Sequence, residues 1–479
     1  MNASPRFYSA LILLATAVCP VRADDWPQFR GFNGSGVATG TEPLPTEFSF
    51  ENKVLWKAKL GDGIGSSVIV AGRVFNTALT TDSTFTVYCH EAATGKELWK
   101  REIPVSNLPR ITPPNSHASS TATADAERVY VYISTIGLIA LDAGNGNEIW
   151  RHPLPKPAYL MDWGSGASPV LIGDRLVFAQ DDDLNSFVIC LDAKTGTENW
   201  RTARPEMLAG YALPVVCEVK GRKDLVIAGS GKLKGYDLDT GKEIWNCNSL
   251  LRTIMTSPVV RDDLIYIAVQ SYGDSTRTLK YALLEWLDTN QDGKLARDEM
   301  PKEFLERFDA SDKNHDKLID ETEIDTAFQH PDNQAAGGNT IQAVRGGGEG
   351  DVTKTHVVWN IDNKSPSNLT SPLVFNNRLH VVKSGGIASC FDATDGSTVW
   401  DRTRIKNFGD YYASPIAADG KIFLAGRNGF VVVLADGPEL KILAKNDLGE
   451  EIFATPSVAD GRLFIRTRES VFCISNEAK

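Results

Sequence analysis

Hydrophobic and polar positions along this chain follow an eleven-residue pattern that occurs five times. In the copy from Cys190 to Trp200, a small residue comes first, a carboxylate third, Gly seventh and Trp last. The copies are residues 89–99, 140–150, 190–200, 235–245 and 390–400. An apolar run, a turn with Gly and a second run ending in Trp are typical of a β-hairpin. Repetition of one hairpin at this spacing predicts a propeller or a solenoid.

A second pattern opens each repeating unit, usually with a hydroxyl residue followed by Pro. The segment that begins at Ser168-Pro169 continues through Gly173-Asp174 into an apolar run at 175–178, which predicts a strand, a turn and a second strand. The eight openings are Ser66-Ser67, Ser119-Ser120, Ser168-Pro169, Leu213-Pro214, Ser257-Pro258, Ser371-Pro372, Ser414-Pro415 and Thr455-Pro456. Two strands here and two in the Trp pattern make one propeller blade. The sequence therefore predicts an all-β, eight-bladed β-propeller.

The residues that close the units indicate how the ring is completed. They are Trp56, Trp99, Trp150, Trp200, Trp245, Trp359 and Trp400, with Leu443 in this role for the seventh blade. Trp56 precedes the first opening, whereas the last unit ends at Ile474 without a Trp. We therefore expect the N-terminal strand to close the last blade, because closure removes the free sheet edges of an open array.

One interval in the repeat is too long for a single blade. Trp245 and Trp359 are 114 residues apart, whereas neighbouring pairs are separated by 41–51 residues. The sequence therefore predicts a propeller formed by residues 24–270 and 346–479, with an insertion at 271–345 in blade five.

The insertion differs from the propeller in both period and charge. Apolar residues at 279–287, 301–308 and 324–328 have helical spacing. Glycines at 337–338 and 346–348 are typical of flexible joints. Residues 285–329 contain fourteen Asp or Glu against six Lys or Arg, which suggests a cation site.

Residues 288–299 have the spacing of a twelve-residue calcium loop. The expected ligands are the side chains of Asp288, Asn290, Asp292 and Glu299 and the carbonyl of Lys294. Gly293 at position 6 fits the sharp turn, and Ala296 at position 9 leaves that ligand to water. Leu295 at position 8 suits a short strand between paired loops.

A second loop of the same length follows at residues 312–323. The expected ligands are Asp312, Asn314, Asp316, the carbonyl of Leu318, Asp320 and Glu323. Lys317 at position 6 must adopt a left-handed conformation, which costs about 1 kcal/mol. The two loops start 24 residues apart and together resemble a compact EF-hand pair, which implies two calcium ions.

Residues 1–23 have the pattern of a secretory signal peptide. Arg6 precedes an apolar stretch from Phe7 to Val18, and small residues lead up to Ala23. The stretch is too short to span a bilayer, and Val18 before Cys19 does not fit a lipoprotein signal. We expect cleavage after Ala23, no lipid anchor, no transmembrane segment, and a periplasmic or secreted protein.

Charge narrows the range of partners. The formal net charge is -11, and it becomes -13 without Arg6 and Arg22. An acidic protein of this kind is not expected to bind nucleic acid.

The remaining chemical candidates are few. Cys89, Cys190, Cys390 and Cys473 occupy one slot of the repeat and are expected to be small buried residues rather than disulfide partners. Whether Cys217 pairs with Cys247 stays open. The run 181–183, three aspartates between two strands, is expected to be a solvated turn rather than a metal site.

The phrase from Cys190 to Trp200 resembles the pyrroloquinoline quinone repeat of quinoprotein propellers, and this likeness extends over nearly the whole mature chain apart from the insertion. The opening segment 25–31 and the blade motifs resemble most closely secreted bacterial quinone-repeat proteins related to the propeller lipoprotein of outer-membrane barrel assembly. That resemblance implies a non-catalytic binding or scaffold protein. It would act as a monomer, with a protein or glycan partner on the propeller face.

The alternative is a dehydrogenase that depends on pyrroloquinoline quinone and acts on an alcohol or a sugar. Resemblance to those enzymes implies eight blades and calcium beneath the quinone, with a carboxylate as base. Their adjacent cysteine pair is missing from this sequence, which argues against bound quinone. No catalytic residue is assigned, because the repeat itself stabilises blades whatever the centre holds.

Overall fold

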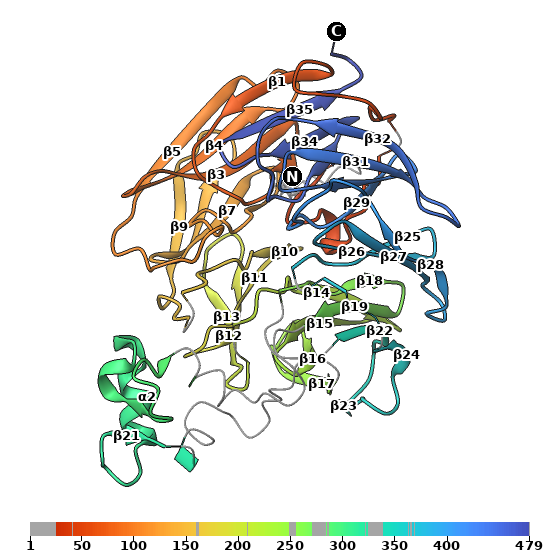
Figure 1. The fold of residues 1–479 in the computed structure, drawn as a ribbon. Helices are drawn as coiled ribbons and strands as arrows, with labels where there is room; N and C mark the ends of the chain where they lie inside the picture. The colour runs from red at the N-terminus through yellow and green to blue at the C-terminus, as the bar shows by residue number, and fades with distance from the viewer. Residues whose placement is uncertain are drawn as a thin grey trace, which may run out of the picture.

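The computed structural model describes residues 25–478 apart from 41, 160–161, 208, 249–254, 271–283, 285–286, 321, 324–338, 363, 365 and 368. Eight antiparallel sheets, each with four strands of one blade, form a ring (Figure 1). The prediction of an all-β, eight-bladed β-propeller is confirmed. The signal-peptide prediction for residues 1–23 lies outside the described residues.

The first strands of neighbouring blades contact one another around the centre of the ring, so they are the innermost. For blades one to eight they are β2 (Val68–Val70), β6 (Thr123–Ala124), β10 (Val170–Ile172), β14 (Val215–Val219), β18 (Val259–Arg261), β25 (Leu373–Phe375), β29 (Ile416–Ala418) and β33 (Ser457–Ala459). The second strands are β3 (Arg73–Thr81), β7 (Arg128–Ile133), β11 (Arg175–Gln180), β15 (Arg222–Gly229), β19 (Leu264–Gln270), β26 (Arg378–Lys383), β30 (Lys421–Ala425) and β34 (Arg462–Arg466).

The two outer strands of each blade complete the sheet. The third strands are β4 (Thr84–Glu91), β8 (Gly137–Asp142), β12 (Phe187–Asp192), β16 (Lys232–Asp237), β22 (Asn339–Arg345), β27 (Ile387–Asp392), β31 (Phe430–Ala435) and β35 (Ser470–Ser475). The outermost strands are β5 (Glu97–Pro104), β9 (Glu148–Pro153), β13 (Glu198–Ala203), β17 (Glu243–Cys247), β24 (Val357–Ile361), β28 (Thr398–Arg404), β32 (Lys441–Asp447) and β1 (Val54–Lys59).

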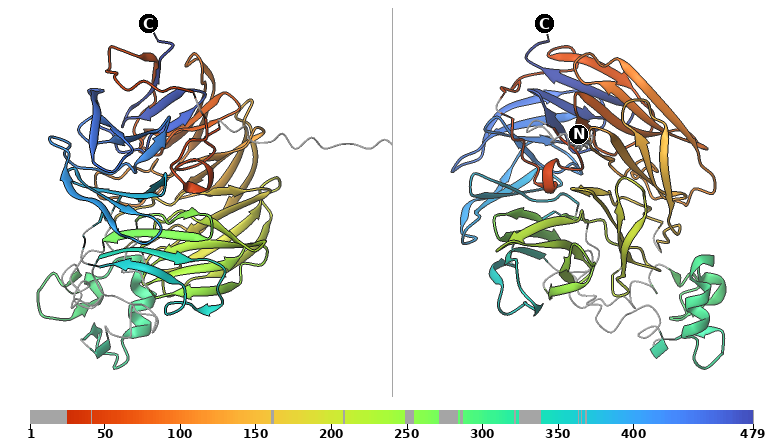
Figure 2. Two further views of the ribbon diagram at one scale, coloured as in Figure 1. Left: turned by 90° about the vertical axis from the view of Figure 1, so that its right-hand side faces the viewer. Right: turned by 180° about the vertical axis from the view of Figure 1, so that it is seen from behind.

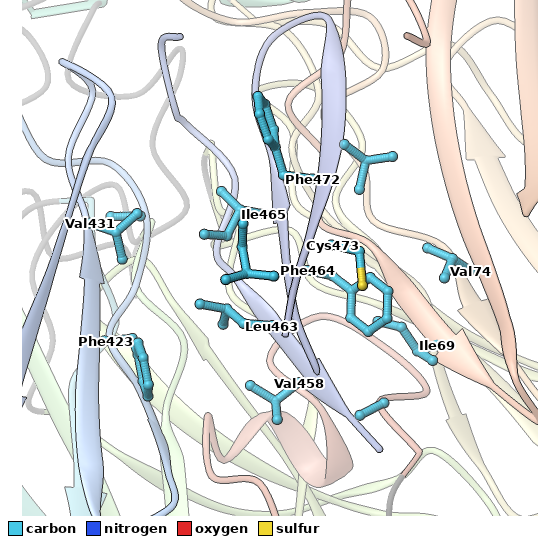
Figure 3. Close-up of a cluster of buried hydrophobic side chains, with 14 of the residues drawn as sticks. Ile69, Val74, Phe423, Val431, Val458, Leu463, Phe464, Ile465, Phe472 and Cys473 are labelled. Atoms are coloured by element: carbon cyan, nitrogen blue, oxygen red, sulfur yellow. The ribbon is translucent and has the colours of Figure 1, made fainter. Parts of the chain in front are cut away.

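The N-terminal strand closes the last blade, as the sequence predicts. Strand β1 pairs antiparallel with β35, with Trp56 opposite Cys473. Blade eight is packed on both of its faces. Figure 3 shows side chains of β34 and β35 between Ile69 and Val74 of blade one and Phe423 and Val431 of blade seven. The closing strand therefore belongs to a continuous apolar core.

Six of the eight blades are attached to the next by the closing Trp, whose indole N–H donates to a backbone carbonyl in the next blade. The pairs are Trp56–Ala92, Trp99–Ala143, Trp150–Ala193, Trp200–Leu238, Trp359–Ala393 and Trp400–Gly437, with N···O distances of 2.9–3.4 Å. The exceptions are blade four, where Trp245 donates to Asp224 of its own blade, and blade seven, which closes with Leu443. The Trp150 ring lies against Gly196, where an added Cβ would be 2.6 Å from the ring. Gly196 also has a φ of 71°. The seventh position of the repeat therefore requires Gly for both conformation and space.

Gly196→Ala is expected to lower the free energy of unfolding by about 2–5 kcal/mol, because left-handed strain adds to the displacement of the Trp150 ring. Gly173→Ala is the matched control, since Gly173 has a φ of 63° and nothing within 4 Å of an added Cβ. It should cost only the conformational term of about 1–2 kcal/mol. Urea denaturation of both variants measures the difference, and equal losses would contradict the proposed role of the ring.

Hydroxyl residues of the opening pattern link the innermost strands to one another. A backbone N–H in one blade donates to a hydroxyl oxygen in the next at 2.9–3.0 Å, in the order Ser66–Thr121, Thr121–Ser168, Leu213–Ser257, Ser257–Ser371, Ser371–Ser414 and Ser414–Thr455. The Ser457 hydroxyl donates to the Ser67 carbonyl at 2.6 Å and joins blade eight to blade one. The Ser-Pro pattern thus satisfies buried backbone donors at the centre of the ring.

An irregular segment before β1 crosses the centre of the ring (Figure 2). We call it the N-terminal strap, residues 25–48 apart from 41, and it contains the short helix η1 (Phe32–Gly34). Its hydrogen-bond partners in blades one, two, three, four, six and seven are Ile69, Ala124, Leu171, Val216, Pro372 and Ala417. The fully buried Arg30 donates to the Pro372 carbonyl at 2.7 Å. Burial lowers the pKa of Arg30 to about 9, with Tyr411 opposing this.

Blade five departs from the predicted boundaries. Residues 339–345, which the sequence places at the end of the insertion, form β22 and pair with β19. Glycines 346–348 lie between β22 and β24 rather than at a joint of the insertion. Strand β23 (Gly350–Asp351) then pairs in parallel with β17 and adds a fifth strand to blade four. The sequence does not reveal β22, because an acidic segment with helical spacing comes directly before it. The change from helical spacing to the alternating pattern of a strand is therefore not apparent.

The described part of the insertion is small and packs beside blade three (Figure 1). It contains β20 (Leu295–Ala296), η2 (Arg297–Glu299), η3 (Lys302–Phe304), α2 (Leu305–Ser311) and β21 (Leu318–Ile319). The helical prediction for 301–308 matches η3 and α2 in part. The predictions for 279–287 and 324–328 fall largely or wholly outside the described residues, as does the joint at 337–338.

The cysteines of the repeat are buried and free, as expected. Cys217 and Cys247 are also buried and form no disulfide, and they stand on β14 and β17, the first and fourth strands of blade four. Strands are spaced about 4.8 Å apart, so two intervening strands keep these cysteines too far apart for a disulfide. Among the described residues, no helix has the length and apolar character needed to cross a membrane.

Candidate functional site

The first acidic loop is held by hydrogen bonds from its own backbone to the predicted ligand residues. The Asp288 carboxylate accepts from the N–H groups of Asp292 and Gly293 at 3.1 and 2.8 Å. The Glu299 carboxylate accepts from Thr289, Asn290 and Ala296 at 2.8, 3.2 and 2.8 Å. The first and last acidic residues of the loop therefore point toward its interior.

The second loop repeats this arrangement position by position. Asp312 accepts from the N–H groups of Asp316 and Lys317 at 3.2 and 3.0 Å. Glu323 accepts from Lys313, Asn314 and Asp320 at 2.8, 3.3 and 3.2 Å. Asp312, Asp316 and Glu323 each bring one carboxylate oxygen within 4.8 Å of the others. The arrangement gathers hard oxygen donors of the kind that calcium prefers.

A short antiparallel ladder joins the two loops at the predicted position. Leu295 pairs with Ile319, and Ala296 pairs with Leu318. Gly293 and Lys317, both at position 6, have φ values of 80° and 68°. Lys317 therefore adopts the left-handed conformation that the sequence requires of it.

Four further predicted ligands accept hydrogen bonds from the backbone of their own loops. Asn290 and Asn314 accept from the N–H groups two residues later, both at 2.8 Å. Asp292 accepts from Lys294 at 2.9 Å, and Asp316 accepts from Leu318 at 2.8 Å. The aspartate at position 5 of each loop thus fixes the backbone of the residue at position 7, whose carbonyl is the expected ligand.

Two of the loop carboxylates have lowered pKa values. Burial opposes ionisation of Glu299, but hydrogen bonds from Ala296, Asn290 and Thr289 outweigh it and lower its pKa. The hydrogen bond from the Thr322 hydroxyl, followed by backbone donors, lowers the pKa of Asp320. Both groups are therefore kept in the anionic form that binds a cation.

The insertion is not a free appendage, because it docks on blade three. Leu295, Phe304, Phe308 and Ile319 share one buried cluster with Ala158, and Leu184 of the β11–β12 loop packs against this cluster. The guanidinium of Arg307 on α2 donates to the carbonyls of Asp183 and Leu184 at 2.9 and 3.4 Å. Blade five thus supplies a segment that rests on blade three. No local pattern in the sequence predicts this contact.

The β11–β12 loop that receives the insertion is itself buried. Asp181, Asp182 and Asp183 are 3%, 2% and 9% exposed, so the prediction of a solvated turn is wrong. Asp181 forms a two-bonded ion pair with Arg204, with both N···O distances at 2.8 Å. Burial raises the pKa of Asp182, although the backbone N–H groups of Asn185, Leu184 and Ala158 oppose this.

Further polar side chains surround this buried loop. The Tyr236 hydroxyl accepts from Arg204, and Lys234 pairs with Glu206 and Glu243. Tyr159 and Tyr211 stack with ring centroids 5.7 Å apart. Burial raises the pKa of both phenols well above the usual value. Arg204, the buried partner of Asp181, directly follows β13 and lies outside the repeated pattern, so the sequence gives no signal for its role.

Comparison with known proteins places the chain in a family. The sequence model described as outer membrane protein assembly factor BamB matches residues 85–295 and 335–478. The chain belongs to this BamB family. BamB from Yersinia pestis is 22% identical over 416 residues, which cover 84% of this chain and 93% of that protein. The crystal structure of BamB from Moraxella catarrhalis has a TM-score of 0.54 at 15% identity, covering 88% of this chain and 98% of that one.

Quinone-dependent enzymes share parts of the same pattern. Quinoprotein ethanol dehydrogenase from Pseudomonas aeruginosa is 28% identical over 168 residues, so the matched part of this BamB-family chain spans 26% of that enzyme's length. The structure of quinohemoprotein alcohol dehydrogenase from Comamonas testosteroni has a TM-score of 0.53 at 11% identity, covering 94% of this chain and 80% of that one. Likeness at this identity establishes a shared propeller fold and nothing about chemistry.

Proposed function

We propose that this protein is an exported, non-catalytic binding propeller that contacts a protein partner during assembly of outer-membrane proteins. The observation that carries the proposal is the span of its relationships. Similarity to BamB extends over 93% of the Yersinia pestis protein, whereas similarity to the ethanol dehydrogenase covers 26% of that enzyme. The partner would meet a propeller face or the docked insertion, and the chain would act as a monomer.

The test is a strain of the source organism that lacks this gene. Outer-membrane proteins should be depleted in its isolated outer-membrane fraction, and the wild-type gene should restore them. Unchanged amounts of these proteins would contradict the assembly role.

The dehydrogenase alternative has its own direct test. Purified protein is incubated with pyrroloquinoline quinone and calcium, and absorbance and dye reduction with alcohols and sugars are recorded. We expect neither a bound-quinone spectrum nor turnover. Dye reduction that depends on quinone would replace the binding function with an oxidoreductase.

We also propose that each loop of the insertion binds one calcium ion. In the first loop Asp288, Asn290, Asp292 and Glu299 would supply side-chain oxygens and Lys294 its carbonyl. In the second loop Asp312, Asn314, Asp316, Asp320 and Glu323 would supply side-chain oxygens and Leu318 its carbonyl. The gathered carboxylates of the second loop support this proposal, because like charges so close favour a bound cation. A glycan on the propeller face remains the alternative to a protein partner.

Glu299→Gln and Glu323→Gln should each abolish one of two calcium sites, because each substitution removes a bidentate charge. The double variant should bind none. Glu306→Gln, on the exposed side of α2 between the loops, is the matched control and should keep both sites. Titration calorimetry counts the sites. Two sites surviving in the double variant would show that calcium binds elsewhere.

A further inference from the structure

Side chains of blades five and six line a cavity of about 330 Å³ that is separate from the calcium loops and from the buried β11–β12 loop. Its apolar wall comes from Ile341 on β22, Val381 on β26 and Ile387 on β27. Lys383, Arg402 and Arg404, all on blade six, line the same space. A volume of this size, with apolar walls and a few polar groups, is typical of small-molecule sites.

Ser389 accounts for the opening between the two blades. The strand registers place it at the same position as Tyr88, Ile139, Ile189, Lys234, Gln342, Val432 and Phe472 in the other blades. Serine is the smallest of these eight side chains. In blades two and three, Ile139 and Ile189 are fully buried at this position. Blade six therefore lacks the side chain that fills the equivalent space elsewhere.

Lys383 gives blade six a cation where no other blade has a charge. The same registers align it with Ala78, Ile133, Gln180, Gly229, Val269, Gly426 and Thr467. Burial, followed by repulsion from Arg402, lowers the pKa of Lys383. An anion beside Lys383 would offset both effects.

Among the described residues that line the cavity, the one carboxylate is already engaged. Asp401 forms an ion pair with Lys364 and accepts from the Ser389 hydroxyl at 2.7 Å. These contacts outweigh burial and lower the pKa of Asp401. Arg402 and Arg404 are exposed, and their guanidinium groups form no ion pair within the part of the chain that the structure describes. The cavity therefore combines apolar side chains with an excess of positive charge, because Lys364 balances Asp401 whereas Lys383, Arg402 and Arg404 add three cations.

We propose that this cavity binds a small organic anion, with a carboxylate or phosphate group at Lys383, Arg402 and Arg404 and an apolar portion against Ile341, Val381 and Ile387. Arginine suits this role because its planar fork matches carboxylate and phosphate oxygens. The site lies away from the calcium loops, so its occupancy does not depend on the insertion.

The test uses the full chain, titrated by calorimetry in phosphate-free buffer at low salt. The probes are benzoate, phenyl phosphate, inorganic phosphate and the uncharged benzyl alcohol. We expect benzoate or phenyl phosphate to bind with a Kd on the order of 1 mM or tighter. Inorganic phosphate should bind about tenfold more weakly than phenyl phosphate, since it leaves the apolar wall bare.

Three variants locate the site. Lys383→Met and Arg404→Gln should each weaken phenyl phosphate about fivefold or more, because each removes one positive charge. Ser389→Ile places in blade six the residue that blades two and three carry, and it should abolish binding by filling the cavity. Arg151→Gln, on the outermost strand of blade two, is the control and should bind as the parent does.

Several results would overturn the proposal. They are the absence of binding by both aromatic anions, binding of benzyl alcohol as tight as that of benzoate, and unchanged binding in Ser389→Ile. If Ser389→Ile fails to fold, Lys383→Met and Arg404→Gln decide the question, since neither changes the packing of the inner strands. Unchanged affinity in both would equally contradict the site.

Discussion

Deletion of residues 24–60 should unfold the whole propeller rather than loosen one end of it. The deletion removes β1, and with it the Trp56 N–H bond to Ala92 at 2.9 Å that joins blade eight to blade one. It also removes the N-terminal strap and leaves the fully buried hydrogen-bond network of the centre without Arg30. The expected loss is at least about 5 kcal/mol, which is comparable to the whole stability of many domains. Thermal unfolding followed by circular dichroism measures it.

Two further variants separate the contributions of strap and strand. Deletion of residues 24–48 keeps β1 and should destabilise the protein less than the full deletion. Phe50→Ala changes a side chain in the same region that is 55% exposed, so it should alter stability by no more than about 0.5 kcal/mol. If the full deletion unfolded at the same temperature as the parent, neither closure by β1 nor the bonds of the strap would be needed for the ring.

The ring could be predicted from the sequence because its stabilising contacts repeat with the chain. Five closing Trp side chains, such as Trp150, lie against a turn glycine of the next blade, such as Gly196, and both residues recur at fixed positions of the repeat. The closure of the last blade was predictable for the same reason. Trp56 has no opening segment before it, and the last unit has no closing Trp, so the two complete one blade. Local patterns determine which strands form, and the sheets then determine the ring.

The N-terminal strap could not be predicted in this way. Its residues form hydrogen bonds with six blades, some of them to residues 400 positions later in the sequence, as with Thr46 and Asn446. The segment has neither strand nor helix period, so its path depends on donors and acceptors that meet only in the folded ring. Nothing in the local sequence distinguishes Arg30 and Asn33 from other polar residues, because their partners Pro372 and Val216 come from distant blades.

The candidate calcium loops could be predicted from local sequence, whereas the burial of the β11–β12 loop on which they rest could not. Twelve consecutive residues contain all the donors of one calcium loop, so spacing alone identifies them. The burial of Asp181–Asp183 depends on Arg204, Ala158 and Arg307, which come from three separate segments. A run of aspartates is solvated unless distant donors satisfy it, and the sequence does not show those donors.

Asp181→Asn is expected to lower the free energy of unfolding by about 3–5 kcal/mol, because it leaves the guanidinium of Arg204 buried without its counter-charge. Burial alone would lower the pKa of Arg204, and Asp181 is the first of the groups that raise it instead. Asp174→Asn is the matched control at the other end of β11. The Asp174 side chain is 83% exposed beside Arg175, and its loss should cost no more than about 1 kcal/mol.

The double variant Asp181→Asn/Arg204→Met distinguishes charge from packing. Removal of both charges should recover most of the lost stability, since an apolar replacement of a buried ion pair is often neutral. Hydrogen exchange at the amides of Leu184 and Asn185, which donate to Asp182, reports on the loop that holds Arg307. Faster exchange there in Asp181→Asn, reversed in the double variant, is expected if the ion pair fixes the platform for the insertion. If the double variant were as unstable as the single one, the loss would come from packing around β11 and not from an unpaired charge.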